Sequence, residues 1–191
     1  MCNPGGRPDI IHGCSYLFPL DVTAAYIGPS PNHQNGRESS ISTRFNAGAF
    51  CAARGISLNE TDLDTHMEEL QDLMAFARST APDMVGGRFD RLVKSENEVC
   101  WQYTSRDRQT VYLAYFHILA APNLPFRRAR LVGLEPGANY ILAEDGASYA
   151  GDALMHSGLP LPYVATGQVK ADMRYMEKGD FTSYIFVFKR A

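Results

Sequence analysis

The chain has 191 residues, of which 45% are hydrophobic and 20% are charged, the composition of a globular protein long enough to bury a sizeable core. The formal net charge of −3 leaves no basic field for phosphate backbones, which argues against a nucleic-acid-binding protein. No apolar run approaches the roughly 20 residues that a membrane-spanning helix needs, and no signal-peptide pattern precedes the first element. We therefore expect a cytoplasmic protein that binds neither membranes nor nucleic acids.

The cysteines and histidines give no signal for a metal site. No two cysteines form a CxxC pair, and no two histidines have the spacing of metal ligands, so we expect neither a metal nor another cofactor. Reduced and mostly buried thiols are the simpler interpretation and fit a cytoplasmic protein. The cysteines are Cys2, Cys14, Cys51 and Cys100, and the scattered histidines are His12, His66, His117 and His156.

The pattern of the sequence changes near residue 86, which predicts one part over residues 1–85 and a second over residues 86–191. The first part reads as helices and loops. Two prolines and two glycines within residues 1–8 (MCNPGGRP) exclude a stable helix there. Residues 22–27 (VTAAYI) are short and apolar, and they predict a fully buried strand of a parallel sheet.

Two helices are expected after that strand. The first is capped by Ser42 or Thr43 and continues to Arg54, before a glycine stop. The second begins near Asn59 or Thr61 and ends at a proline. Apolar residues at three- and four-residue steps make one stripe along the second helix. They are Leu63, Met67, Leu70, Met74 and Ala77.

The second part reads as short strands separated by turns, which predicts an antiparallel β-sandwich. Trp101 is interpreted as a core residue, although a tryptophan can also stack on a sugar ring. His117 lies in an apolar strand and is interpreted as a core or face histidine with its hydrogen bonds satisfied. The predicted strands cover residues 88–92, 98–104, 110–119, 128–132, 139–143, 170–176 and 183–189.

A long polar loop over residues 29–37 (PSPNHQNGR) follows the predicted parallel strand. Long ordered loops on a rigid scaffold often bind ligands. The side chains of Asn32, His33 and Arg37 can equally satisfy the backbone groups of the loop itself. Both interpretations stay open from the residues alone.

Several short motifs follow one another along the chain. They are Phe18-Pro19, residues 31–37 (PNHQNGR), Thr43-Arg44, Gly87-x-Phe89-x-Arg91-Leu92, Trp101, Leu131-x-Gly133-Leu134-Glu135-Pro136 with Tyr140, Gly151-Asp152-x-Leu154-Met155 with Gly158-Leu159, and Gly179-Asp180-Phe181-x-Ser183. This order resembles the C-terminal part of α-galactosidases of glycoside hydrolase family 36, over nearly the whole chain.

The resemblance implies a terminal fragment of a (β/α)8 barrel, with one strand (strand eight) and helices, followed by an antiparallel β-sandwich. Family members are retaining hydrolases of terminal α-galactosides, and they use two aspartates as nucleophile and acid/base. By the register of the motifs both aspartates lie upstream of Met1. The resemblance therefore implies no catalytic residue in this chain, which is expected to be inactive alone. Tyr26, Asn32, His33 and Arg37 are the residues expected near the barrel mouth, where they would bind substrate.

Two departures from the family pattern bear on specificity. Tyr26 stands where many members have histidine, and residues 57–59 (SLN) stand where many have Glu-Leu-Asp. The resemblance also implies a homo-oligomeric parent enzyme. Three hypotheses remain: a fragment of an α-galactosidase, a fragment of a glycosidase with another specificity, and a short non-catalytic module that binds carbohydrate or a partner.

A single strand cannot close a barrel, because its backbone and apolar surface would lack neighbours. We therefore expect the front part to be unstable or self-associating when isolated. Residues 87–191 are expected to fold alone.

Overall fold

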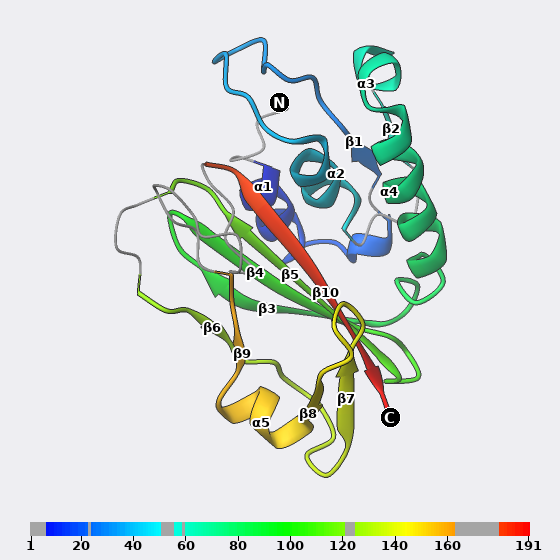
Figure 1. Ribbon diagram of the computed structural model, residues 1–191, viewed down its shortest axis with the longest axis vertical. Helices are drawn as coiled ribbons and strands as arrows, with labels where there is room; N and C mark the ends of the chain where they lie inside the picture. Colours follow the sequence, from blue (N-terminus) through cyan, green and yellow to red (C-terminus); the bar gives the residue numbers. More distant parts are fainter. Residues whose placement is uncertain (1–6, 23, 51–55, 59, 121–124, 163–179) are drawn as a thin grey trace.

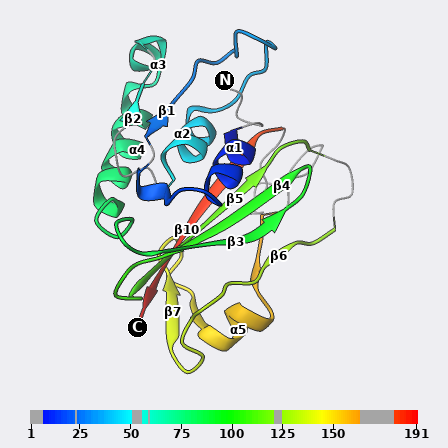
Figure 2. The same cartoon turned by 180° about the vertical axis from the view of Figure 1, so that it is seen from behind.

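The structure is a computed structural model, and it describes residues 7–22, 24–50, 56–58, 60–120, 125–162 and 180–191. Helices from the first half lie over one face of an antiparallel sheet (Figure 1). A strand pair and a short helix lie over the other face, as the reverse view in Figure 2 also shows. The described residues therefore make three layers with the sheet in the middle.

The first half contains a strand–helix–strand unit. Its elements are α1 (Arg7–Cys14), the 3-10 turn η1 (Leu20–Val22), β1 (Ala25–Tyr26), α2 (Ile41–Ala49), β2 (Ile56–Ser57), α3 (Glu60–Thr65) and α4 (Met67–Thr80). Strands β1 and β2 pair in parallel, and α2 connects them along the chain. The expectation of a single strand in the first half was wrong, since β2 is a second one. β2 was not predicted because its two residues leave no periodic pattern in the sequence.

The boundaries of two front elements differ from the predicted ones. Strand β1 covers two residues instead of six, because the chain first makes the turn η1. Helix α1 begins at Arg7, inside the stretch in which a helix was excluded. Pro8 is tolerated because it lies in the first turn, where an N–H has no intrahelical acceptor to lose.

Helix α2 begins earlier than predicted, because its cap is Ser40 and neither Ser42 nor Thr43. Ser40 is its N-cap, with φ −60° and ψ 152°, and the Ser40 Oγ accepts a hydrogen bond from the Thr43 backbone N–H at 3.1 Å. This contact satisfies one of the open donors of the first turn. The helix ends at Ala49 with Phe50 as its C-cap, and residues 51–55 lie outside the described part.

The second predicted helix is divided into α3 and α4 at His66, whose φ of −131° is not helical. The predicted apolar stripe is buried only in α4. Leu70 is buried, whereas Leu63 and Met67 are exposed. The predicted helical period was therefore correct, but the apolar residues at the start of the stripe, Leu63 and Met67, are exposed.

The second half is built on a six-stranded sheet with the order β3-β4-β5-β10-β7-β8, in which every pair is antiparallel. Strands β6 and β9 form a separate antiparallel pair. The elements are β3 (Arg88–Lys94), β4 (Glu98–Thr104), β5 (Thr110–His117), β6 (Arg128–Ala129), β7 (Asn139–Leu142), β8 (Ser148–Ala150), α5 (Gly151–His156), β9 (Leu159–Pro160) and β10 (Thr182–Arg190).

The prediction of an antiparallel second half is confirmed. Strands β8 and β9 and helix α5 were not predicted, because each is too short for a periodic pattern. The strand predicted over residues 170–176 lies outside the described part. Among the described residues, the two antiparallel sheets of the second half are unequal, with six strands in one and two in the other.

Both faces of the central strands are buried. One face joins residues of β4 and β5 to the front helices, and the other joins them to β6, β9 and α5. This is why every residue of β4 is buried instead of every second one. The front-facing core contains Leu20, Ala47, Phe50, Met84, Val99, Trp101, Tyr103, Tyr112, Ala114 and Phe116.

Trp101 lies at the centre of this shared core with no exposed surface. Its ring packs against those of Phe50 and Phe116, with centroid distances of 6.0 and 5.0 Å. Its Nε1–H donates to His12 Nδ1 of α1 at 3.1 Å. The interpretation of Trp101 as a core residue is confirmed, and its ring is not available to stack on a sugar.

The shared core argues against the expectation that residues 87–191 fold alone. Without α1, α2 and η1, the aromatic residues of β4 and β5 on this face would meet water. Such a large apolar patch promotes association. The front helices are thus one layer of the fold.

Replacing Phe50 by alanine tests this shared core. We expect Phe50→Ala to lower the free energy of unfolding by about 3–5 kcal/mol, because it leaves a cavity against Trp101. Phe126 is 92% exposed, and Phe126→Ala is the matched control, expected to change stability by less than about 0.5 kcal/mol. Urea unfolding followed by Trp101 fluorescence measures both. Equal effects would contradict the shared core.

Candidate functional site

Tyr26 ends strand β1 and is 41% exposed. The polar loop that follows, residues 28–40, lies at the top of Figure 1. Because β1 and β2 are parallel, the segments that follow the two strands leave the pair at the same end. Loops at the carboxyl ends of parallel strands carry the functional residues of barrel and open α/β folds. Tyr26 lies at the carboxyl end of β1, and Asn32, His33 and Arg37 follow it in the loop.

Asn32 organises the loop. Its backbone N–H donates to Arg37 O and its carbonyl accepts from Gly36 N–H, both at 2.8 Å. Its Oδ1 accepts from Gln34 N–H at 3.0 Å. The residue is only 2% exposed. Asn32 therefore acts as a structural residue of the loop.

His33 and Arg37 lie on the exposed surface of the same loop. The Arg37 guanidinium sits 5.3 Å from the ring centroid of Phe181. Within the described part of the chain, no hydrogen bond or ion pair joins Tyr26, His33 and Arg37 to one another. The structure thus brings His33 and Arg37 onto one loop without assembling the three into a single cluster.

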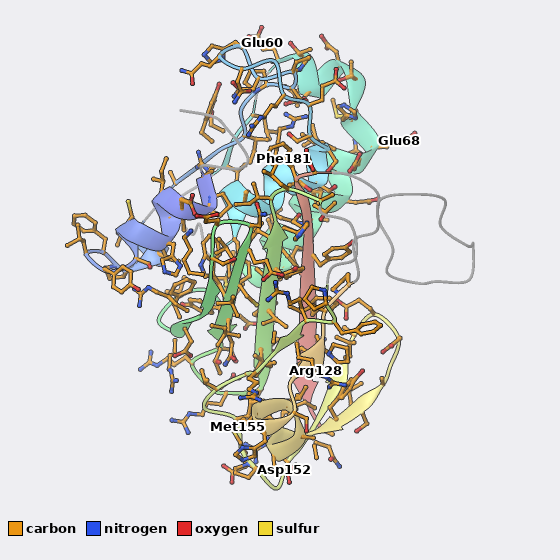
Figure 3. All side chains as sticks on the ribbon, turned by 90° about the vertical axis from the view of Figure 1, so that its left-hand side faces the viewer. Glu60, Glu68, Arg128, Asp152, Met155 and Phe181 are labelled. Carbon is orange, nitrogen blue, oxygen red and sulfur yellow. The ribbon has the colours of Figure 1, made fainter. Side chains whose placement is uncertain are left out.

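Phe181 belongs to one of the family motifs but was not among the predicted site residues. It is buried, and its φ of 58° is unusual for a residue other than glycine. Its backbone N–H donates to Ile118 O at 2.8 Å. Figure 3 shows Phe181 at the start of β10, at the end of the sheet far from Asp152 of α5. Phe181 therefore joins the sheet to the loop through Arg37.

A buried ion pair holds the base of the loop. Arg44 of α2 donates to both carboxylate oxygens of Asp62 of α3, at 2.6 and 2.9 Å. The side chains are 3% and 4% exposed. Arg44 Nη1 also donates to Gly28 O at 2.6 Å. Arg44 therefore links helices α2 and α3 through Asp62, and it links both to Gly28 at the start of the loop.

Polar contacts also join α2 to the sheet. Asn46 Nδ2 donates to Ser183 Oγ at 3.0 Å, and Ser183 Oγ donates to Thr43 Oγ1 at 3.3 Å. Ser183 belongs to β10, directly after Phe181 and Thr182. The loop and the helix that follows it are thus both attached to the start of β10.

A second polar group lies on the other face of the sheet. Glu98, His117 and Thr182 face one another across β4, β5 and β10. Glu98 is buried and accepts from Tyr115 Oη at 2.9 Å, and Arg127 Nε lies 3.3 Å from it. Burial is the main cause that raises the pKa of Tyr115.

The expectation of a satisfied His117 was wrong. Neither ring nitrogen has a hydrogen-bond partner among the described residues, and the side chain is buried. Burial lowers the pKa of His117, although Glu98 and Asp180 act in the opposite direction. Burying both ring nitrogens without a hydrogen-bond partner costs stability.

The described residues offer no candidate metal centre, because no three side chains of histidine, cysteine, aspartate or glutamate come together. Cys14 and Cys100 are free thiols, and Cys2 and Cys51 lie outside the described part. None of the described helices is long and apolar enough to cross a membrane.

Residues 98–188 match the family described as the glycosyl hydrolase family 36 C-terminal domain. The chain belongs to glycosyl hydrolase family 36. Alpha-galactosidase AgaA of Geobacillus stearothermophilus is 34% identical over 160 residues, which are 82% of this chain and 22% of that protein. The bifunctional alpha-galactosidase/sucrose kinase AgaSK of Mediterraneibacter gnavus is 29% identical over 82% of this chain and 17% of its own.

Solved family 36 structures superpose on the whole chain. The crystal structure of AgaA from Geobacillus stearothermophilus gives a TM-score of 0.83 at 30% identity, covering 100% of this chain and 25% of AgaA. The alpha-galactosidase of Lactobacillus brevis gives 0.84 at 28% identity, with the same coverage. An AgaA variant has been solved in complex with raffinose. This chain spans about a quarter of the length of these relatives.

Breaking the buried ion pair tests its role at the base of the loop. We expect Asp62→Ala to destabilise the chain by about 3–5 kcal/mol, because Arg44 keeps a buried and partly unpaired charge. The double variant Arg44→Met with Asp62→Leu is expected to lose less than Asp62→Ala alone. Asp90→Ala is the control, since its partner Arg88 is 57% exposed, and it should cost less than about 1 kcal/mol. Urea unfolding of the full chain measures all three.

The buried histidines predict an acid-sensitive fold. Burial is the main cause that holds the pKa of His12 and of His117 below the ordinary value, so the unfolded chain binds more protons below about pH 6.5. We expect the free energy of unfolding to fall as the pH drops from 7.5 to 5.5. His117→Leu should reduce this slope, whereas the exposed control His33→Leu should keep it. An unchanged slope in His117→Leu would contradict the assignment.

Proposed function

We propose that this chain supplies the end of the catalytic barrel and the C-terminal β domain of a retaining α-galactosidase. The observation that carries this proposal is the similarity over the whole chain to solved family 36 α-galactosidases, at a TM-score of 0.83 and 30% identity. The β1–α2–β2 unit is the barrel part, and the two antiparallel sheets are the sandwich. The substrate class is terminal α-galactosides, since a relative has been solved with raffinose.

In this proposal the chain positions the substrate but carries no catalytic aspartate. Tyr26, His33 and Arg37 reach the barrel mouth from the carboxyl end of β1. Asn32 shapes their loop, the Arg44–Asp62 pair fixes its base, and Phe181 contacts Arg37. Retaining hydrolysis needs two carboxyl groups about 5–5.5 Å apart, which the upstream barrel strands would provide.

A chimera tests the proposal directly. The matching C-terminal quarter of AgaA is replaced by this chain, and hydrolysis of an aryl α-galactoside and of raffinose is measured. We expect a folded chimera that hydrolyses both substrates, because the upstream part brings the two aspartates. The isolated chain should hydrolyse neither.

A pair of substitutions in the chimera compares a residue of the proposed barrel mouth with a residue far from it. Arg37→Ala in the chimera should lower kcat/KM while Asp152→Ala, on α5 at the far end of the molecule (Figure 3), should leave it unchanged. A folded chimera without activity would contradict the proposed role. Activity in the isolated chain would overturn the assignment of the aspartates to the upstream part. Cytoplasmic location and homo-oligomeric assembly remain predictions.

A further inference from the structure

The β4–β5 hairpin, green beside the C-terminus in Figure 1, carries two arginines on a tight turn. Arg108 N–H donates to Ser105 O at 2.9 Å and closes the turn. The carboxylate of Asp107 is held by the hairpin itself, because its Oδ1 accepts from Ser105 Oγ at 2.6 Å and from Gln109 N–H at 3.0 Å. Arg106 and Arg108 flank this internal contact.

A pocket of about 210 Å³ lies beside the hairpin. Its volume is below the roughly 300 Å³ at which pockets for drug-sized ligands begin, so it suits one small group. Its lining combines three arginines, three glycines and two hydroxyl side chains, with no carboxylate. The lining residues are Arg88, Arg106, Arg108, Gly86, Gly87, Gly133, Thr104 and Ser105.

The guanidinium groups around this pocket keep open donors. Within the described part of the chain, no hydrogen bond or ion pair engages the side chain of Arg106 or Arg108. Arg88 uses Nε and Nη2 on Asp90 Oδ1, at 2.9 and 2.8 Å, which leaves Nη1. A Cβ on Gly133 would lie only 2.8 Å from Nη1. Glycine at position 133 is therefore what lets the Arg88 guanidinium reach this wall.

The backbone of Arg108 adds a second, independent observation. Its φ is 58°, in the left-handed region that glycine or asparagine usually occupies in hairpins. Two other lining residues with positive φ, at 70° and 66°, are the glycines Gly86 and Gly133. An arginine in a conformation that glycine adopts more easily indicates that its side chain serves something other than the fold.

We propose that this pocket binds an oxyanion, namely a phosphate group that is either free or carried by a sugar. Guanidinium groups bind phosphate oxygens through paired charge-assisted hydrogen bonds. The Asp107 carboxylate is engaged within the hairpin. Asp90 engages two donors of Arg88, so Arg88 contributes Nη1, while Arg106 and Arg108 contribute their whole guanidinium groups. This binding can be measured on the isolated chain and does not depend on the proposed α-galactosidase function.

The pocket is separate from the loop that carries Arg37. Arg190 N–H, at the end of β10, donates to Gln109 O of the hairpin at 2.8 Å. Phe181, which contacts Arg37, directly precedes the start of β10. The nine residues of β10 span roughly 30 Å. Binding at the hairpin therefore leaves the loop uncovered.

The test is an NMR titration of the full 191-residue chain with inorganic phosphate and then with a hexose 6-phosphate, at constant ionic strength. We expect saturable amide shifts at Gly86, Gly87, residues 105–108 and Gly133. Arg106→Gln and Arg108→Gly should each weaken phosphate binding at least about tenfold. The exposed Arg130, outside the pocket, gives the matched control Arg130→Gln, which should change affinity less than about twofold.

Arg108→Gly separates binding from folding, because glycine relaxes the positive φ and should raise the melting temperature while phosphate binding weakens. A hexose phosphate that binds more than about tenfold tighter than inorganic phosphate would identify a sugar-borne group. Equal affinities would identify the free ion, and both results uphold the site. Non-saturable shifts, or equal weakening in Arg106→Gln and Arg130→Gln, would overturn it.

Discussion

The packing of the front helices onto the Trp101 face of the sheet is the constraint on which the rest of the structure depends. The indole is fully buried, donates to His12 of α1 and packs against Phe50 at the end of α2. A sheet buried on both faces cannot lose one covering layer without exposing aromatic surface. The sequence boundary near residue 86 therefore separates two patterns of secondary structure that share the front-facing core.

The same packing decides where the functional loop can lie. Helix α2 is fixed on β10 through Asn46 and Ser183, and its Arg44 holds both Asp62 and the carbonyl of Gly28. The loop after β1 starts and ends on these anchors, and Phe181 meets it from the sheet. In the proposed α-galactosidase, the C-terminal domain would thus hold part of the barrel mouth in place without taking part in the chemistry.

The long elements could be predicted because they bury regular patterns. Strands β4 and β5 have runs of apolar and aromatic residues, and Trp101 was correctly placed in the core. Strands of two residues, such as β2, leave no periodic signal. The positive φ of Phe181 and Arg108 could not be predicted, because neither residue type favours that backbone region. The order of motifs, by contrast, indicates the family from the sequence alone.

Native-state hydrogen exchange on the full chain tests the shared core most directly, because it measures the opening free energy of each helix and strand separately. We expect slowly exchanging amides of α2, β4 and β5 to open with the same free energy, as parts of one cooperative unit. Opening of α1 and α2 at a clearly lower free energy, while β4 and β5 stay protected, would contradict the shared core. In that case the sheet would be stable without its front layer.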